Sequence, residues 1–431
     1  MPVFAEFCWT LWLIVVPILF LRLEFAVHKV GATTDARDIE ALTQIKAAVD
    51  PSTITSFTCL ASWEFSADPC DAIFGSYFVC GIQCGNGGAG SRRVVSLTLD
   101  SSGYKGTLSP YIGNLSALQE LKISGNVFSG TIPRTLGQLS NLNKLDLSDN
   151  ALLGLIPDSL GQLSSLSYLS LANNMLEGPI PGALGNLHNL QRLSLYNNKL
   201  DGNIPPLIKL QQLSYFDASR NFLSGPISSV FDLPASIISL SLGCNLFGGN
   251  IPKSLSTLDN LEVLDLSSNF IAGCVQKSVF ELSSLQQLNL SHNRFTSISV
   301  PDLSGLDSQL VAVDISYNDI RGSLPVLMAN MTKLSALSMR YNRLTGNIPY
   351  EYGNKANASF NSLLTGVRPL LRLLLDGNFL TGEVPAPFLG LAPDHIKASF
   401  IFNCLQSCPS QYSFCQGGSQ RPLSECANMS Y

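Results

Sequence analysis

Residues 145–157 have the sequence Leu-Asp-Leu-Ser-Asp-Asn-Ala-Leu-Leu-Gly-Leu-Ile-Pro, and a pattern of this form, LxLxxNxLxGxIP, recurs along most of the chain. Most units begin 24 residues apart, and the exceptions are steps of 23, 25 and 36 residues. The first positions are Leu97, Leu121, Leu145, Leu169, Leu193, Phe216, Leu240, Leu264, Leu288, Val313, Leu337 and Leu373. Such regular spacing predicts a repeat architecture that grows along one axis.

The residue types within the repeat predict its structure. The alternation of Leu145, Asp146 and Leu147 directs two leucines inward and Asp146 toward solvent, as in a short strand of a parallel sheet. Every unit except the first, which has Ser102, carries Asn five places on, and its amide can satisfy backbone groups of its own and adjacent rungs. We therefore predict an α/β repeat fold, a right-handed, curved leucine-rich repeat solenoid of about twelve rungs. Strands about 4.8 Å apart give it an arc of roughly 55 Å.

Two of the three irregular steps can be placed within their units. The 25-residue step has Ser297 where Gly is expected, and we expect its extra residue to lie away from the strand. The 36-residue step has extra residues after Pro349, and we expect an extra loop over residues 350–367 on the convex side.

The cysteines gather at the two ends of the repeat. Because the intervening solenoid separates the two groups, we expect disulfides within each group, while the sequence leaves three pairings open in each. The disulfide candidates are Cys59, Cys70, Cys80, Cys84, Cys404, Cys408, Cys415 and Cys426. Cys244 and Cys274 fall at different points of adjacent rungs, so we expect no bond between them.

The first residues resemble a targeting segment. Residues 7–21 are apolar except for Thr10 and Pro17, and small residues follow at positions 31 and 32. We predict a signal peptide over residues 1–32 and secretion to the extracellular space or cell wall. A retained N-terminal membrane anchor is the alternative, because Glu6 and no Lys or Arg precede the apolar run. No later segment is long and apolar enough to span a bilayer, so the mature chain should have no membrane span.

The remaining boundaries follow from the repeat. Apolar residues at Ile39, Leu42, Ile45 and Val49 predict an amphipathic helix over residues 35–49, with Asp35 or Asp38 as N-cap. We place an N-terminal cap at residues 33–94, the repeats at residues 95–392, and a cysteine-rich C-terminal cap at residues 393–431. The caps would cover apolar side chains of the terminal rungs.

Composition and motifs exclude several functions. Only 13% of the residues are charged, the net charge is −5, and no long run of Lys or Arg occurs, which argues against a nucleic-acid binder. None of the four His residues has a Ser or Cys partner at a recognisable spacing, and no pattern of zinc ligands occurs. We expect no enzyme activity, no cofactor and no metal site.

The outward positions of the strands supply candidate binding residues. Tyr168, Arg192 and Tyr215 occupy the same position in three consecutive units, with Tyr196 and Arg220 nearby. Because Tyr and Arg often anchor interfaces, we predict that these five residues bind a partner. Ordinary solvated surface groups are the alternative interpretation. A second candidate column lies at strand ends and comprises His292, Tyr317 and Tyr341.

Glycosylation sequons support an extracellular address. They occur at Asn114, Asn289, Asn330, Asn357 and Asn428. Asn114 and Asn330 occupy equivalent convex positions. Asn289 lies between Leu288 and Leu290 and should therefore point from the concave face.

The sequence resembles the extracellular leucine-rich repeat proteins of plants. The segments that carry the resemblance are the cap around residues 39–42, Trp63, residues 68–70 and 81–84, and the repeat segment at residues 130–137. Asn403-Cys404-Leu405 and Gln420-Arg421 resemble the carboxy-terminal caps of secreted or wall-associated members. The resemblance covers residues 35 to 426 and implies the fold and an extracellular origin.

The family includes receptor kinases, receptor-like proteins without kinases, and inhibitors of fungal polygalacturonase. The sequence ends at Tyr431 without a kinase or a nearby membrane span, and it lacks the adjacent cysteine pair of the inhibitors. We expect a non-kinase receptor-like or accessory component of plant extracellular signalling or defence. It would bind a protein, peptide or glycan on its concave face, and a membrane receptor kinase is a further candidate partner. An inhibitor of a cell-wall-degrading enzyme such as polygalacturonase is the main alternative, and a structural wall protein is the third.

Overall fold

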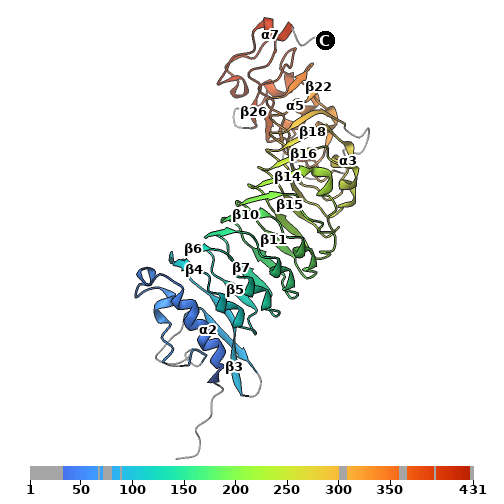
Figure 1. Ribbon diagram of the computed structural model, residues 1–431. Helices are drawn as coiled ribbons and strands as arrows, with labels where there is room; N and C mark the ends of the chain where they lie inside the picture. Colours follow the sequence, from blue (N-terminus) through green and yellow to red (C-terminus); the bar gives the residue numbers. More distant parts are fainter. Residues whose placement is uncertain are drawn as a thin grey trace, which may run out of the picture.

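The computed structural model describes residues 33–66, 68–70, 80–87, 90–299, 308–358, 366–392 and 395–427. The predicted signal peptide and the sequon at Asn428 lie outside the described residues. The described chain winds into an elongated, curved solenoid, with helix α2 (Ala36–Ala47) near one end and helix α7 (Leu423–Ala427) at the other (Figure 1).

One sheet runs the length of the solenoid. Every first position of the repeat lies in one of its strands, and the leucines pair in register from rung to rung, as Leu145 does with Leu169. In order, the strands are β1 (Thr33–Thr34), β3 (Ser91–Thr98), β5 (Glu120–Lys122), β7 (Lys144–Asp146), β9 (Tyr168–Ser170), β11 (Arg192–Ser194), β13 (Tyr215–Asp217), β15 (Ser239–Ser241), β17 (Val263–Asp265), β19 (Gln287–Asn289), β21 (Ala312–Asp314), β23 (Ala336–Ser338), β25 (Arg372–Leu374) and β26 (Lys397–Ser399). These strands are parallel, and β2 (Ile82–Asn86) pairs with β3 in the antiparallel direction. The predicted solenoid is confirmed.

The recurring asparagines form the predicted ladder. The amide nitrogen of Asn174 lies 3.0 to 3.2 Å from the carbonyl oxygens of Leu147, Leu171 and Ala172. Its Oδ1 accepts a hydrogen bond from the backbone N–H of Leu152 in the preceding rung, at 3.0 Å. Without Asn174, the buried N–H of Leu152 would lose this acceptor, and each of the three carbonyls would lose one of its two donors. The same pattern repeats along the repeat, as at Asn198, Asn245 and Asn342.

A second sheet lies just beyond the ladder and was not predicted. It is built from the residues after each Asn, where Leu152 points inward and its neighbours Ala151 and Leu153 point outward. Its nine parallel strands are β4 (Lys105–Thr107), β6 (Val127–Gly130), β8 (Ala151–Gly154), β10 (Met175–Pro179), β12 (Lys199–Gly202), β14 (Phe222–Pro226), β16 (Leu246–Gly249), β18 (Phe270–Val275) and β20 (Arg294–Ile298). Strands β22 (Arg321–Ser323) and β24 (Arg343–Thr345) form a separate pair.

Short helices form the convex side. Most begin directly after a proline of the repeat, such as Pro133 or Pro157, whose fixed φ suits a helix start. They are η3 (Pro110–Asn114), η4 (Arg134–Gln138), η5 (Asp158–Gln162), η6 (Gly182–Asn186), η7 (Ile227–Ser229), η8 (Lys253–Thr257), α3 (Lys277–Phe280), α4 (Val326–Asn330), α5 (Tyr350–Ala356) and α6 (Ala386–Leu389).

The two irregular units are accommodated away from the concave strands. In the 25-residue unit, the pairing of β18 with β20 shifts between Gly273 and Cys274, which leaves Thr296 as the extra residue in the second sheet. In the 36-residue unit, the segment expected to be a loop begins with helix α5, which corresponds to the convex helix of the other rungs. Residues 359–365 of that segment lie outside the described residues.

Both ends of the core are covered. Helix α2 has Asp35 as its N-cap, which accepts a hydrogen bond from the backbone N–H of Arg37, whereas Asp38 is fully buried and forms an ion pair with Arg93 at 2.8 Å. Two short helices follow, η1 (Pro51–Thr53) and η2 (Cys59–Ser62). The N-cap prediction is thereby resolved in favour of Asp35.

At the other end, the structure adds a thirteenth rung to the twelve expected. Strand β26 pairs with β25, and Asn403 continues the ladder inside the segment predicted to be the C-terminal cap. Beyond it, Gln420 accepts hydrogen bonds from the backbone N–H groups of Asn403 and Leu405, and Arg421 donates to the carbonyl of Asn378. These two side chains replace the backbone partners that a further rung would supply. Helix η11 (Ser413–Cys415) packs beside β26.

All eight cap cysteines are paired within their own end, as predicted. The disulfides are Cys59–Cys80, Cys70–Cys84, Cys404–Cys426 and Cys408–Cys415. Cys244 and Cys274 are free, which confirms that they are not bonded to each other.

We predict that replacing Asn174 with Ala lowers the free energy of unfolding by roughly 2 to 4 kcal/mol, because the buried N–H of Leu152 loses its acceptor and three carbonyls each lose one donor. Chemical denaturation of the purified protein measures the change. Asn189→Ala is the matched control, because Asn189 is exposed on the convex side and makes one hydrogen bond, to the carbonyl of Ser164. A loss no larger than that of the control would contradict a stabilising ladder.

We also predict that peptide mapping under non-reducing conditions recovers the four disulfides above, with Cys244 and Cys274 open to alkylation without reductant. A disulfide between one of the first four cap cysteines and one of the last four would be incompatible with the solenoid.

Candidate recognition surface on the concave sheet

The structure aligns three of the five predicted binding residues in one row. Arg192 of β11 pairs in register with Tyr168 of β9 on one side and with Tyr215 of β13 on the other. Each precedes a fully buried core residue, so its own side chain points outward from the concave sheet.

Two members of this row, Arg192 and Tyr215, hold each other in place. The guanidinium carbon of Arg192 lies 3.7 Å from the ring centroid of Tyr215, which is cation–π distance. The Tyr215 hydroxyl donates a hydrogen bond to Oδ2 of Asp217 at 3.2 Å. Burial and the charge of Asp217 raise the pKa of Tyr215, so the phenol keeps its proton at neutral pH.

The row extends to a residue that sequence reasoning missed. The ammonium of Lys144, in β7, lies 5.7 Å from the ring centroid of Tyr168 and pairs with Glu120 at 2.9 Å. Lys144 occupies the position equivalent to Tyr168 in the preceding unit, so alignment of the units could have added it to the predicted row.

The other two predicted residues form a separate pair near the strand ends. The guanidinium carbon of Arg220 lies 5.9 Å from the ring centroid of Tyr196. Arg220 has a φ of 55°, a left-handed conformation shared by the residue before the ladder Asn in most rungs. Four of the five predicted residues therefore form two cation–π pairs, and the fifth, Tyr168, contacts Lys144.

The second predicted column is a continuous aromatic stack. His292 and Tyr317 stack with ring centroids 4.2 Å apart, and Tyr317 and Tyr341 stack at 4.7 Å. All three residues have positive φ. The next rung has Gly377 at this position, where an added Cβ would lie 2.6 Å from the Tyr341 ring. Glycine at this position therefore makes room for the last ring of the stack.

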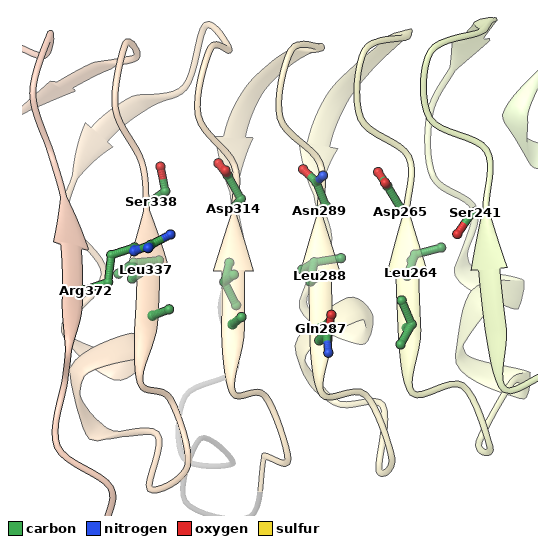
Figure 2. Close-up of a pocket in the computed structure, with 14 residues that line it drawn as sticks. Ser241, Leu264, Asp265, Gln287, Leu288, Asn289, Asp314, Leu337, Ser338 and Arg372 are labelled. Carbon is green, nitrogen blue, oxygen red and sulfur yellow. The ribbon is translucent and has the colours of Figure 1, made fainter. Parts of the chain in front are cut away.

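A hollow of about 290 Å³ opens on the concave face beyond the row of Tyr215, and sequence reasoning did not anticipate it. Its polar lining includes Asp265, Asn289, Asp314 and Ser338, which stand side by side on successive strands, with Arg372 at one end (Figure 2). The hollow exists because Ala312 and Ala336 occupy the position that Arg192 and Tyr215 fill in earlier rungs.

The sequons at Asn114, Asn289 and Asn330 lie on the sides that the sequence predicts, whereas Asn357, expected in the extra loop, caps a helix. Asn114 and Asn330 are exposed at the ends of the convex helices η3 and α4, and Asn357 is exposed at the end of α5. Asn289 lies on the concave side within the hollow, half-buried, and its Oδ1 accepts hydrogen bonds from the backbone N–H and the hydroxyl of Ser291. Occupancy of Asn114, Asn330 and Asn357 stays a prediction.

The described residues contain no group of three or more His, Cys, Asp or Glu side chains placed to hold a metal ion. Within the same ranges, no helix is long and apolar enough to span a bilayer.

Comparison with known proteins identifies the repeat. The family model described as leucine rich repeat matches residues 116–176, 140–200, 235–295 and 260–308. The chain has the leucine-rich repeat solenoid fold. A probable leucine-rich repeat receptor-like protein kinase of Arabidopsis thaliana is 38% identical to it over 108 residues, which is 25% of this chain and 10% of the kinase.

Solved structures of plant receptors share the fold of this leucine-rich repeat protein. The ectodomain of the Arabidopsis thaliana receptor kinase GASSHO1/SCHENGEN3, in complex with CASPARIAN STRIP INTEGRITY FACTOR 2, is 29% identical with a TM-score of 0.67. That match covers 85% of this chain and 44% of the ectodomain. The plant peptide hormone receptor RGFR1, in complex with RGF2, is 30% identical with a TM-score of 0.59, covering 70% of this chain and 50% of the receptor. The chain thus spans half or less of the length of these three relatives.

The fold also occurs outside plants. A leucine-rich repeat protein of Leptospira interrogans is 29% identical with a TM-score of 0.54, covering 73% of this chain and 76% of that one. Fold similarity alone therefore does not identify a role. A functional assignment must rest on the outward residues of the concave sheet.

Proposed function

We propose that this leucine-rich repeat protein recognises an extracellular peptide or protein on its concave sheet, as a receptor-like or accessory component of plant signalling or defence. The observation that carries the proposal is the ordered row of Tyr168, Arg192 and Tyr215, which projects from the concave sheet beside an open hollow. The two plant receptors of similar fold were solved in complex with RGF2 and with CASPARIAN STRIP INTEGRITY FACTOR 2.

The contacts within the row suit a binding surface. Tyr buries a large area at a low cost in conformational entropy, and Tyr and Arg are enriched among the residues that dominate interface energies. Arg192 is already stacked on Tyr215, and Tyr215 is already hydrogen-bonded to Asp217, so less side-chain freedom is lost when a partner binds.

The cellular setting follows from the disulfides. Four disulfides at the two ends favour an oxidising compartment, so we place the chain in the extracellular space or cell wall. There the partner would be a protein or peptide ligand, with a membrane receptor kinase as a further partner. We propose a binding scaffold rather than an enzyme.

Inhibition of a wall-degrading enzyme is the alternative that the same concave face could serve. The two functions differ in a direct assay: an inhibitor lowers the activity of purified polygalacturonase in vitro, whereas a recognition component leaves it unchanged. We expect no inhibition.

We predict that replacing Tyr168 and Tyr215 together with Ala weakens partner binding more than 20-fold, because truncation of an interface anchor costs about 2 kcal/mol or more. The probe is the tightest-binding peptide selected from a displayed random-peptide library on the immobilised wild-type protein. Isothermal titration calorimetry compares its affinity for the two proteins.

Tyr350→Ala is the control, because Tyr350 is an exposed tyrosine at the start of convex helix α5. Unchanged affinity in the Tyr168 and Tyr215 variant, with the fold intact by circular dichroism, would return these residues to the solvated-surface interpretation.

A further inference from the structure

We infer that the hollow over β17 to β25 is a subsite for a basic side chain, Lys or Arg, of an extended peptide that carries an acidic residue about three positions away. This inference rests on the proposed function, because it assumes that a peptide lies on the concave sheet. It goes beyond that function by naming the ligand chemistry at a place outside the tyrosine row.

The shape of the hollow suits the stem of a long side chain. Val263, Ala312 and Ala336 supply short apolar groups along one of its rows. An aliphatic chain of a Lys or Arg can cover such a surface while its charged end reaches polar groups.

Two carboxylates stand beside this apolar row. Oδ1 of Asp265 accepts a hydrogen bond from the backbone N–H of Ser267, and Oδ1 of Asp314 accepts one from the backbone N–H of Ser316, both at 2.9 Å. In the part of the chain that the structure describes, no hydrogen bond or ion pair involves Oδ2 of either residue. Each carboxylate therefore keeps one oxygen for a ligand.

A buried hydroxyl gives an independent indication of a missing ligand. Ser338 is 6% exposed, and its Oγ has no hydrogen-bond partner among the described residues. Figure 2 shows its oxygen beside Asp314, on the same side of the sheet as the carboxylates. A buried hydroxyl without a partner is unfavourable, and a ligand N–H would satisfy it.

Arg372 is the residue that would bind the acidic residue of the proposed peptide. Its side chain is exposed and extends from β25 across Leu337 of β23 (Figure 2), and it makes no ion pair within the described ranges. A ligand that covers this guanidinium must supply an anion, because a charge removed from water needs a partner. Strands β21 and β25 are two spacings apart, about 10 Å, which an extended peptide crosses in about three residues.

Selection from a displayed random-peptide library on immobilised protein tests this pattern. We expect the wild-type protein to enrich peptides with a basic residue and an acidic residue about three positions apart. The double variant Asp265→Asn, Asp314→Asn should bind the best selected peptide at least tenfold more weakly than the wild-type protein does. A synthetic copy of that peptide with its basic residue changed to Ala should bind the wild-type protein at least tenfold more weakly than the original peptide does.

The repeat shows that the two substitutions are compatible with the fold, and it supplies a matched control. Asn289 already makes the same turn contact to Ser291 that Asp314 makes to Ser316, so Asn is compatible with this position. Asp146→Asn is the control, because Asp146 makes the equivalent contact to Ser148 in β7, outside the hollow. This control should bind the peptide as the wild-type protein does.

The outcomes separate the two proposals. If the wild-type protein enriches no peptide above the empty support, the proposed function fails, and this inference fails with it. If selected peptides bind through Tyr168 and Tyr215 but show no basic residue, or bind the double variant equally well, only the subsite is overturned. Glycopeptide mass spectrometry adds a check: we expect Asn289 to be unoccupied, because a glycan there would fill the hollow while leaving the tyrosine row open.

Discussion

The asparagine ladder is the constraint on which the rest of the structure depends. A solenoid turns its backbone inward once per rung, and each turn would bury carbonyl and N–H groups without partners. Asn is suited to this place because one side chain carries both donors and an acceptor. Asn174 contacts carbonyls of its own and the preceding rung, and it accepts from the second sheet of that preceding rung. The ladder thus ties both sheets together and fixes the register of every outward residue.

This constraint explains which features the sequence predicted. The Leu and Asn positions of the repeat define the buried side of each rung. From these positions the solenoid, the ladder and the absence of a bond between Cys244 and Cys274 could be predicted. The second sheet was missed, although the alternation of Ala151, Leu152 and Leu153 carries its signal, because the strands are short and follow an irregular turn. The thirteenth rung was missed because Ala398 and Phe400 replace the two usual leucines of the strand, and only Asn403 and Leu405 match the pattern.

The candidate site was predictable only in part, for a physical reason. Alignment of the units places Tyr168, Arg192 and Tyr215 in one row, because parallel strands in register repeat the same position. Contacts between side chains, such as Arg192 on Tyr215, depend on rotamers that no repeat pattern specifies. A hollow is still harder to predict, because it results from small residues, Ala312 and Ala336, rather than from residues that stand out by their chemistry.

The aromatic stack shows where the outward positions depart from what the fold requires. The residue before the ladder Asn adopts positive φ in most rungs, a conformation that Gly, Asn and Asp adopt at least cost. Asp149, Asn173 and Asn197 follow this preference, whereas Tyr317 and Tyr341 do not. Tyr317 stacks on His292 at a centroid separation of 4.2 Å and on Tyr341 at 4.7 Å, and this stacking offsets part of that cost. Backbone strain at bulky, half-exposed residues favours a role in recognition over one in folding, because the ladder would form equally well with Asn or Gly at these positions.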